Sequence, residues 1–293
     1  MRLRLRDTYM MHTVTSAELP ADSAVARTRH GPIEYRLTGT GPVVLVLKGG
    51  HSSRDTHLGH ERLAEHGFTV LEPSRPGYDR TPASAGCSAQ AAADALAELL
   101  DVLGIARVRL IAISAAGHTG IELARRHPQR VDRVSFESAV ALPWPATMRR
   151  GGRLLFGPVQ PLIWGAVRTG LRLAPSLMLR AQLAPLTTLN AAQVVREMDP
   201  ATRERYLAAY RSLWSGRGFA CDLGHDSPST VPLGQPALIL SGAYDRSVSS
   251  AHGDRLARVF PNHERVVVES ETHFIWFGRA ADEVWDRRLA FLA

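Results

Sequence analysis

The sequence predicts an α/β fold in which helices cover both faces of a mostly parallel sheet. From Val43 onward, short apolar runs typical of buried strands alternate with longer runs typical of helices. This alternation requires crossover connections, which place parallel strands side by side in one sheet. It stops after Ala139 and resumes at Ala237, with helices and no convincing strand between them. We therefore expect a helical segment inserted after the sixth strand.

Six strands are predicted before the insertion, and the first two form an antiparallel pair joined near His30-Gly31. Val43 to Leu47 is an unbroken apolar run, as expected of a central parallel strand. Ser88 is expected to cap the clearest helix, whose apolar residues fall on one face. The predicted strands are 24–27, 33–37, 43–47, 68–71, 108–113 and 131–136, and the predicted helices are 54–66, 88–103 and 115–126.

The best-defined helix of the insertion begins at Asp199-Pro200, a capping residue followed by proline at the first helical position. It extends to about Ser215. Strands at 237–241 and 264–268 and helices at 250–259 and 281–292 complete the chain. The pattern predicts a loose N-terminal tail at 1–23, a core at 24–140 and 225–293, and a helical cap at 141–224.

The composition is that of a globular protein with an excess of arginine. The chain has 293 residues and a formal net charge of +7, and Lys48 is its one lysine. The arginines are scattered in ones and twos without interleaved aromatic residues, so nucleic-acid binding is not expected. The best membrane-spanning candidate, Leu154 to Val167, is interrupted by glycines and prolines, so no span is expected.

Cysteine usage and the N-terminus together predict a cytoplasmic protein. Cys87 and Cys221 are far apart and match no metal or redox spacing, so we expect free thiols in a reducing compartment. Residues 1–7 alternate charged and apolar side chains, unlike a signal peptide. The histidines show no metal-ligand spacing. We expect a monomer or homodimer with no metal and no other cofactor.

Ser114 lies where a predicted strand turns directly into a predicted helix. Such a turn holds its central residue in a strained, left-handed conformation and presents the hydroxyl at a helix N-terminus, where negative charge is favoured. The neighbours two positions away, Ala112 and Ala116, are small enough to allow this turn. The same residues also suit a serine that simply caps a helix. Other parts of the sequence are needed to choose between these two interpretations.

Polar residues and glycines follow the other predicted strands at the point where each ends. Gly49-Gly50 follows one strand, Asp245 another and His273 the last. In open parallel sheets, functional groups gather beyond these carboxyl ends. A serine, a carboxylate and an imidazole thus occur in the order Ser, Asp, His, separated by 131 and 28 residues. The first interval leaves room for the insertion, and the second fits one helix and one strand.

This order and its context resemble the α/β-hydrolase fold family over roughly residues 24 to 293. The resemblance is carried by several loops taken together. They are the oxyanion loop Leu47-Lys-Gly-Gly-His-Ser-Ser53, the loop Ser74-Arg-Pro-Gly-Tyr-Asp-Arg80, the nucleophile elbow Ile113-Ser-Ala-Ala-Gly117, the acid loop Gly242-Ala-Tyr-Asp245, and the histidine loop Thr272-His-Phe274.

The resemblance implies a role for each matching residue. Ser114 would be the nucleophile, and His273 would take its proton and return it to the leaving group. Asp245 would orient the imidazole and stabilise its charged form. The N–H groups of Gly50 and Ala115 would bind the oxyanion.

The sequence departs from the family pattern in three of these loops, and one of them is the elbow, which has alanine for glycine on both sides of the serine. Lys48 stands where the family has histidine, and His51 lies just beyond. We favour a salt bridge at the base of the loop for Lys48 over contact with a substrate carboxylate. Glu137, after the sixth predicted strand, is a rival for the acid; Asp245 is preferred because its loop matches better. Glu269 or Glu271 would raise the pKa of His273 if it lay close, although surface exposure is the simpler interpretation.

Further residues are candidates for a substrate pocket, although for most of them we favour a structural interpretation. Tyr78 is expected to be structural, His118 packed, and the insertion's aromatic residues part of its own core. A cap rich in apolar residues still favours a largely apolar ligand. The pocket candidates are Lys48, His51, Tyr78, His118, Glu137, Trp144 and Trp164.

Three functions follow from this interpretation. The first is a serine hydrolase that cleaves an ester, thioester or lactone of a small molecule through an acyl-enzyme. The second uses the same residues for carbon–carbon bond hydrolysis of a vinylogous diketone or for acyl transfer. The third is a ligand receptor with little turnover. A serine at position 114 argues against epoxide hydrolase and dehalogenase chemistry, which in this fold uses an aspartate.

Overall fold

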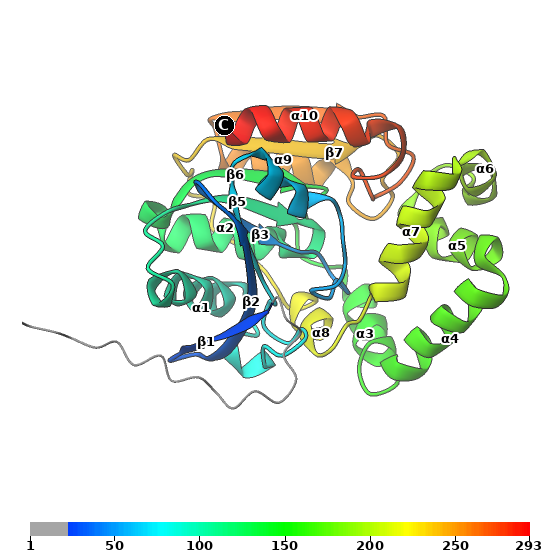
Figure 1. The fold of residues 1–293 in the computed structure, drawn as a ribbon, viewed down its shortest axis with the longest axis horizontal. Coiled ribbons are helices and arrows are strands. Elements are labelled where there is room, and N and C mark those ends of the chain that lie inside the picture. Colours follow the sequence, from blue (N-terminus) through cyan, green and yellow to red (C-terminus); the bar gives the residue numbers. More distant parts are fainter. Residues whose placement is uncertain (1–22) are drawn as a thin grey trace, which may run out of the picture.

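The computed structural model describes residues 23–293, and an eight-stranded sheet runs through its centre (Figure 1). The predicted tail lies outside the described residues, except for Ser23. The strand order is β1-β2-β4-β3-β5-β6-β7-β8. β2 pairs antiparallel with β1 and β4, and the other neighbouring pairs are parallel. The mostly parallel sheet expected from the alternating pattern is confirmed.

The strand predictions hold, with ends that shift by a few residues. The unbroken apolar run at β3 and the run before Ser114 are central strands, as predicted. The strands are β1 (Ala24–Thr28), β2 (Gly31–Gly39), β3 (Val43–Leu47), β4 (Thr69–Pro73), β5 (Val108–Ile113), β6 (Val131–Glu137), β7 (Ala237–Gly242) and β8 (His263–Val268).

Two apolar layers enclose the sheet because alternate strand residues point to opposite faces. Val44 and Val46 contribute to one buried cluster, and Leu45 and Leu47 contribute to the other. The second cluster is closed by α1 (Ala89–Val102), α2 (Gly117–Arg126) and α9 (Ser250–Val259), and the first by α10 (Ala281–Leu292) and part of the insertion. Ser88 caps α1 through the N–H of Ala91, as predicted.

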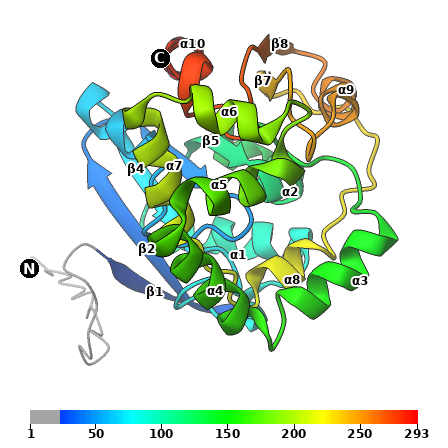
Figure 2. The same ribbon diagram turned by 90° about the vertical axis from the view of Figure 1, so that its right-hand side faces the viewer.

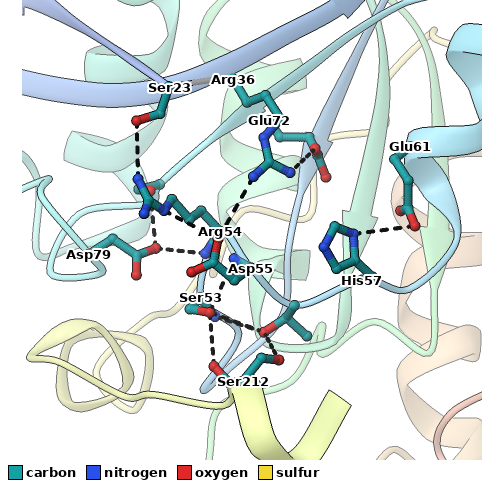
Figure 3. Close-up of polar contacts among 12 residues, drawn as sticks. Ser23, Arg36, Ser53, Arg54, Asp55, His57, Glu61, Glu72, Asp79 and Ser212 are labelled. Carbon is teal, nitrogen blue, oxygen red and sulfur yellow. Dashed lines mark hydrogen bonds and ion pairs between the residues drawn. The ribbon is translucent and has the colours of Figure 1, made fainter. Parts of the chain in front are cut away.

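The helix predicted at 54–66 is largely wrong. Only the 3-10 helix η1 (His60–His66) forms, and Gly59 before it has φ 89°, which a helix cannot accommodate. Side-chain oxygens instead accept hydrogen bonds from the backbone N–H groups of the residues before η1. Arg54 N–H donates to Asp79, and Asp55 N–H donates to the Ser53 hydroxyl (Figure 3). Short polar side chains compete with helical hydrogen bonds in this way.

The segment between β6 and β7 is helical in the part predicted to be a cap, and it lies beside the sheet (Figures 1 and 2). Its best-predicted helix, α7, is capped by Asp199 through the N–H of Thr202. The division into core and cap at 140/141 and 224/225 stays a prediction. The helices are α3 (Ala146–Leu155), α4 (Gln160–Leu173), α5 (Pro175–Leu183), α6 (Ala191–Glu197), α7 (Pro200–Ser212) and α8 (Gly218–Asp222).

The prediction of free thiols is wrong, because Cys87 and Cys221 form a disulfide with a Cα–Cα distance of 4.9 Å. The bond joins the loop before α1 to α8 across 134 residues of sequence. Spacing alone hides this proximity, because the fold brings the insertion back onto the core. The cytoplasmic expectation loses the support of free thiols. Among residues 23–293, no helix is both long and apolar enough to cross a membrane.

Candidate active site

Ser114 occupies the sharp turn between β5 and α2 with φ 48°, the left-handed conformation expected for this position. Its carbonyl accepts a hydrogen bond from Val140 N–H, which helps to hold the turn. Neither the short 3-10 turn at 114–116 nor α2 has a side-chain cap. The alternative of a serine that caps its own helix is therefore not the arrangement found.

Three predicted side chains meet at the carboxyl end of the sheet. His273 Nε2 lies 2.9 Å from Ser114 Oγ, and His273 Nδ1 lies 2.6 Å from Asp245 Oδ2. Asp245 and His273 are each 7% exposed, so water competes little for these bonds. The geometry permits a proton to pass from the hydroxyl to the imidazole while a carboxylate faces the far side of the ring.

The environment of Asp245 keeps this carboxyl group ionised. Its Oδ1 accepts hydrogen bonds from Ser247 N–H at 2.8 Å and Val248 N–H at 3.0 Å, and the Ser247 hydroxyl adds a third. Burial opposes ionisation, but His273 and these donors outweigh it and lower the pKa of Asp245 below its ordinary value. An ionised carboxylate is therefore the hydrogen-bond partner of His273 Nδ1.

Gly50 and Ala115, the predicted oxyanion donors, approach one another closely. A Cβ built on Gly50 would lie 3.3 Å from the Ala115 Cβ and 2.9 Å from the Phe219 ring. A Cβ on Gly49 would lie 3.0 Å from the Ser114 Cβ. Glycine is therefore required where the loop after β3 meets the serine turn.

Arg75 holds the backbone of the loop at residues 47–53, which we call the glycine loop. This role was not predicted from the sequence. Its Nε donates to Lys48 O at 2.7 Å, and its Nη2 donates to Gly49 O at 3.1 Å. A trans peptide is planar, so fixing the direction of the Gly49 carbonyl also fixes the opposite direction of the Gly50 N–H. The arginine of the Ser74-Arg-Pro-Gly-Tyr78 motif was a signal that could have revealed it.

Asp222 at the end of α8 neutralises Arg75 in the interior. The carboxylate accepts two hydrogen bonds from Arg75, at 2.5 and 2.8 Å, and a third from the Tyr78 hydroxyl at 2.6 Å. Arg75 is 4% exposed and Asp222 is 1% exposed. Burial raises the pKa of Asp222, but Arg75 outweighs it and keeps the pKa below its usual value. Tyr78 is structural, as we favoured.

Residues 212–222, which we call the inner strap, also hold the glycine loop directly. Trp214 N–H donates to the His51 carbonyl at 2.7 Å, and the Ser53 hydroxyl donates to the Ser212 carbonyl at 2.8 Å (Figure 3). The Cys87–Cys221 disulfide lies next to Asp222 in the same segment. The inner strap therefore fastens the insertion to the loop that carries Gly50.

His51 points into the insertion and does not pair with Ser114. Its Nδ1 lies 2.6 Å from the Ser215 hydroxyl, and its ring packs against Phe219 at 3.8 Å between centroids. Burial lowers the pKa of His51 to about 3, against the opposing charge of Asp222. The ring is therefore a neutral packing group at neutral pH. Trp164 donates to the same Ser215 hydroxyl and is also packed.

Lys48 forms the salt bridge that we favoured, with its Nζ 3.1 Å from Glu72 and 2.8 Å from the Arg54 carbonyl. His118 is buried and packed, as favoured, with Nδ1 2.7 Å from the Ser227 hydroxyl. Trp144 lies near Phe219, and its indole nitrogen has no hydrogen-bond partner among the described residues.

Glu137, the rival acid, is part of a separate buried network. Arg288 donates to both of its oxygens at 2.7 and 2.8 Å, and His60 lies 2.9 Å away. Burial would raise the pKa of Glu137, but Arg288 and His60 outweigh it and hold the pKa well below its usual range. Glu271 forms an ion pair with Arg279. Within residues 23–293, no group of three acidic, histidine or cysteine side chains is arranged to hold a metal ion.

Comparison with known proteins agrees with this architecture. A family model described as the alpha/beta hydrolase fold matches residues 42–280. The match spans most of the chain, and the protein belongs to this hydrolase family. The resemblance predicted from the sequence is confirmed.

Two curated relatives cover most of the chain. The protein named "Uncharacterized hydrolase YcgS" from Bacillus subtilis (strain 168) is 33% identical over an alignment of 270 residues, which covers 89% of this chain and 95% of that protein. A 2-hydroxy-6-oxononadienedioate/2-hydroxy-6-oxononatrienedioate hydrolase from Burkholderia vietnamiensis is 26% identical over 244 residues, covering 78% of this chain and 80% of its own.

Solved structures share the fold at low sequence identity. An alpha/beta hydrolase fold protein from Nakamurella multipartita superposes with a TM-score of 0.78 at 24% identity, covering 92% of this chain and 98% of its own. An enol-lactonase from Burkholderia xenovorans LB400 gives a TM-score of 0.66 at 22% identity, with 92% and 99% covered. These similarities establish the fold alone.

Proposed function

We propose that the protein is a serine hydrolase that cleaves an ester, thioester or lactone of a largely apolar small molecule through an acyl-enzyme. The contiguous hydrogen-bonded chain from Asp245 through His273 to the Ser114 hydroxyl carries this proposal. An alcohol is a weak nucleophile at neutral pH, and an adjacent oriented imidazole is the group that activates it. Family membership supports the hydrolytic outcome.

The reaction begins when Ser114 Oγ attacks the substrate carbonyl carbon as His273 Nε2 takes its proton. The N–H groups of Gly50 and Ala115 bind the developing oxyanion, a contribution of about 3–4 kcal/mol for each donor. His273 then protonates the leaving group, and the acyl group remains on Ser114. Water, deprotonated by His273, attacks the acyl-enzyme. His273 then returns this proton to Ser114 Oγ as the bond to the acyl group breaks and the acid leaves.

Arg75 serves this reaction as a positioning residue. By holding the Lys48 and Gly49 carbonyls, it keeps the Gly50 N–H directed at the site while no substrate is bound. Preorganised donors of this kind cost no rearrangement when charge develops. Asp222 holds Arg75 in turn, so the inner strap supports the oxyanion donor through two ion-paired side chains.

Carbon–carbon bond hydrolysis on the same residues is the second candidate. It is supported by the relative from Burkholderia vietnamiensis, whose name specifies hydrolysis of 2-hydroxy-6-oxo dienedioates. Both reactions need a carbonyl carbon near Ser114 and donors for an oxyanion. They differ in the leaving group, so relative turnover of the two substrate classes separates them.

The decisive experiment maps a fluorophosphonate adduct by mass spectrometry and measures turnover of a short chromogenic ester. We expect the label on Ser114, and Ser114→Ala is expected to lower turnover by at least about 1,000-fold. Ser138→Ala is a matched control, because Ser138 also has a positive φ of 44° after a strand and its hydroxyl has no partner among the described residues. The control should keep turnover within a few-fold of the parent.

Other outcomes are equally informative. Adducts at another residue, or no adduct on folded protein, would contradict both catalytic proposals. Faster turnover of a 2-hydroxy-6-oxo dienoate than of esters would select carbon–carbon hydrolysis. Thermal stabilisation by a ligand that is never converted would select the receptor.

A further inference from the structure

The outer helices α3, α4 and α5 expose a concentration of large apolar side chains. Twelve such side chains are exposed in residues 23–293, and seven of them lie between Met148 and Leu177. Three of these are exposed to 70% or more. Scattered exposed leucines are normal in a folded protein, but a contiguous apolar surface marks a binding region. The seven are Met148, Leu154, Leu155, Val159, Leu162, Leu173 and Leu177.

On helix α4 the exposed residues align along one face. Leu162, Ala166, Thr169 and Leu173 are spaced by four, three and four residues, which aligns them along one face of a helix. All four are exposed. The opposite face, with Trp164, Val167 and Leu171, is buried against the rest of the insertion. One side of α4 is therefore used in packing, and the other presents leucines to solvent.

The charge of the same region is entirely positive. No aspartate or glutamate occurs between Glu137 and Glu197, whereas seven arginines do, a number equal to the net charge of the whole chain. Arg149, Arg150, Arg172 and Arg180 are exposed, and no carboxylate among the described residues pairs with them. Figure 2 shows that α4 and α5 lie on the outside of the molecule. The exposed leucines and arginines of α3–α5 give these helices a cationic, amphipathic character.

A second copy of the chain is a poor match for this surface. A two-fold interface would place the same acid-free, arginine-rich region of one copy against that of the other. Juxtaposed like charges disfavour such a complex. A surface with negative head groups over an apolar interior offers counter-charges to the arginines and an apolar environment to the leucines.

We propose that the outer helices α3–α5 bind the surface of membranes that contain anionic phospholipids. The arginines contact the phosphate head groups, and Leu162, Leu173 and their exposed neighbours enter the boundary between head groups and acyl chains. Because α4 lies flat on such a surface, no spanning helix is needed. The proposal does not depend on the chemistry at Ser114.

Flotation of the full-length protein with vesicles tests the proposal. Phosphatidylcholine vesicles with and without phosphatidylglycerol are compared at low and high salt. We expect binding to the anionic vesicles at low salt, loss of that binding at high salt, and no binding to phosphatidylcholine alone.

Two sets of exposed substitutions locate the binding surface. Leu162→Gln/Leu173→Gln and Arg149→Gln/Arg150→Gln/Arg172→Gln should each weaken partitioning at least about tenfold. Leu37→Gln/Val102→Gln is the apolar control, at positions 45% and 50% exposed outside the insertion. Arg29→Gln/Arg279→Gln/Arg287→Gln is the charge control, in exposed ion pairs. Both controls should bind within about twofold of the parent.

Unchanged thermal midpoints would show that each variant is folded. Failure of the parent to bind anionic vesicles, or equal binding by all variants, would overturn the proposal. So would light scattering that shows a dimer broken by Leu162→Gln/Leu173→Gln in a protein that binds no vesicles, because the occupant would then be a second copy.

Discussion

The inner strap and the outer helices belong to the same insertion, yet they have opposite relations to the core. Residues 212–222 donate and accept hydrogen bonds across to the glycine loop, bury an ion pair and carry a disulfide. Helices α3–α5 leave large apolar side chains such as Leu173, 81% exposed, without a partner among the described residues. Figure 1 shows α8 beside the sheet and α4 far from it.

This difference shows that an insertion in sequence is not one unit in energetic terms. The inner strap cannot separate from the core without exposing Arg75 and breaking the bonds to His51 and Ser53, so it acts as part of the scaffold around Ser114. The outer helices can accept a partner without disturbing those contacts. We expect substitutions to have large effects in the first region and small ones in the second.

The largest effect is expected for Asp222→Asn. The substitution keeps the shape of the side chain but leaves the buried Arg75 guanidinium without a counter-charge, which typically costs about 3–5 kcal/mol of unfolding free energy. Measured well below the unfolding temperature, kcat for ester turnover should fall about 10- to 100-fold, because the Gly50 N–H loses its orientation. Denaturant unfolding and steady-state kinetics check the two effects.

Asp226→Asn is the matched control, because Asp226 lies four residues further along and is exposed. Its unfolding free energy should stay within about 0.5 kcal/mol of the parent. A loss of stability in Asp222→Asn with no change in kcat would leave Arg75 a structural residue and remove its positioning role.

Replacing the disulfide by Cys87→Ser/Cys221→Ser should have the next largest effect. Closing a loop of 134 residues constrains the unfolded chain, and such a bond contributes about 2–4 kcal/mol. A reducing agent should lower the unfolding free energy of the parent by a similar amount and leave the double variant unchanged. Equal stability of parent and variant would show that the hydrogen bonds of the inner strap suffice to hold α8.

The strand and helix order of the sheet was predictable from the sequence because most of these elements are encoded locally. Short, nearly unbroken apolar runs predicted β3 and β5, and capping residues predicted α1 at Ser88 and α7 at Asp199. Ser114, Asp245 and His273 could be grouped because parallel strands deliver their carboxyl ends to one edge of the sheet. The helix predicted at 54–66 failed because Gly59 and polar side chains impose a local conformation that periodicity does not register.

The contacts between the inner strap and the core were not predictable, because they join residues far apart in the sequence. Nothing near Asp222 indicates that it faces Arg75, 147 residues away, and nothing near Cys221 identifies Cys87 as its partner. The same holds for His51, whose ring turns toward Ser215 rather than toward Ser114. Such pairings depend on how the insertion folds back, which a strand and helix pattern does not specify.

A smaller effect is expected from the pH dependence of His51. In the unfolded chain an imidazole gains a proton near pH 6.5, whereas burial lowers the pKa of His51 to about 3 in the folded protein. Between these values protonation favours unfolding, so stability falls as the pH falls, by about 2 kcal/mol from this group at about pH 5. His51→Asn, which tolerates the φ of 62°, should remove that share of the slope.

Three other buried histidines and the partly buried His252 also have lowered pKa values, so the parent slope contains several contributions. The difference in unfolding free energy between His51→Asn and the parent, measured with denaturant from about pH 7 to pH 5, isolates the contribution of His51. Parallel curves of stability against pH for the two proteins would mean that His51 binds a proton as readily in the folded protein as in the unfolded chain, with its contact to Ser215 intact.

The smallest effect is expected on the outer surface of α4. Leu173 and Leu171 lie two residues apart on the same helix, but Leu173 is 81% exposed and Leu171 is 1% exposed. Leu173→Ala should change the unfolding free energy by less than about 0.5 kcal/mol. Leu171→Ala removes buried methyl groups and should cost about 2–5 kcal/mol. A large loss from Leu173→Ala in the isolated protein would mean that this face is already covered in solution, and the contrast between the two regions of the insertion would no longer hold.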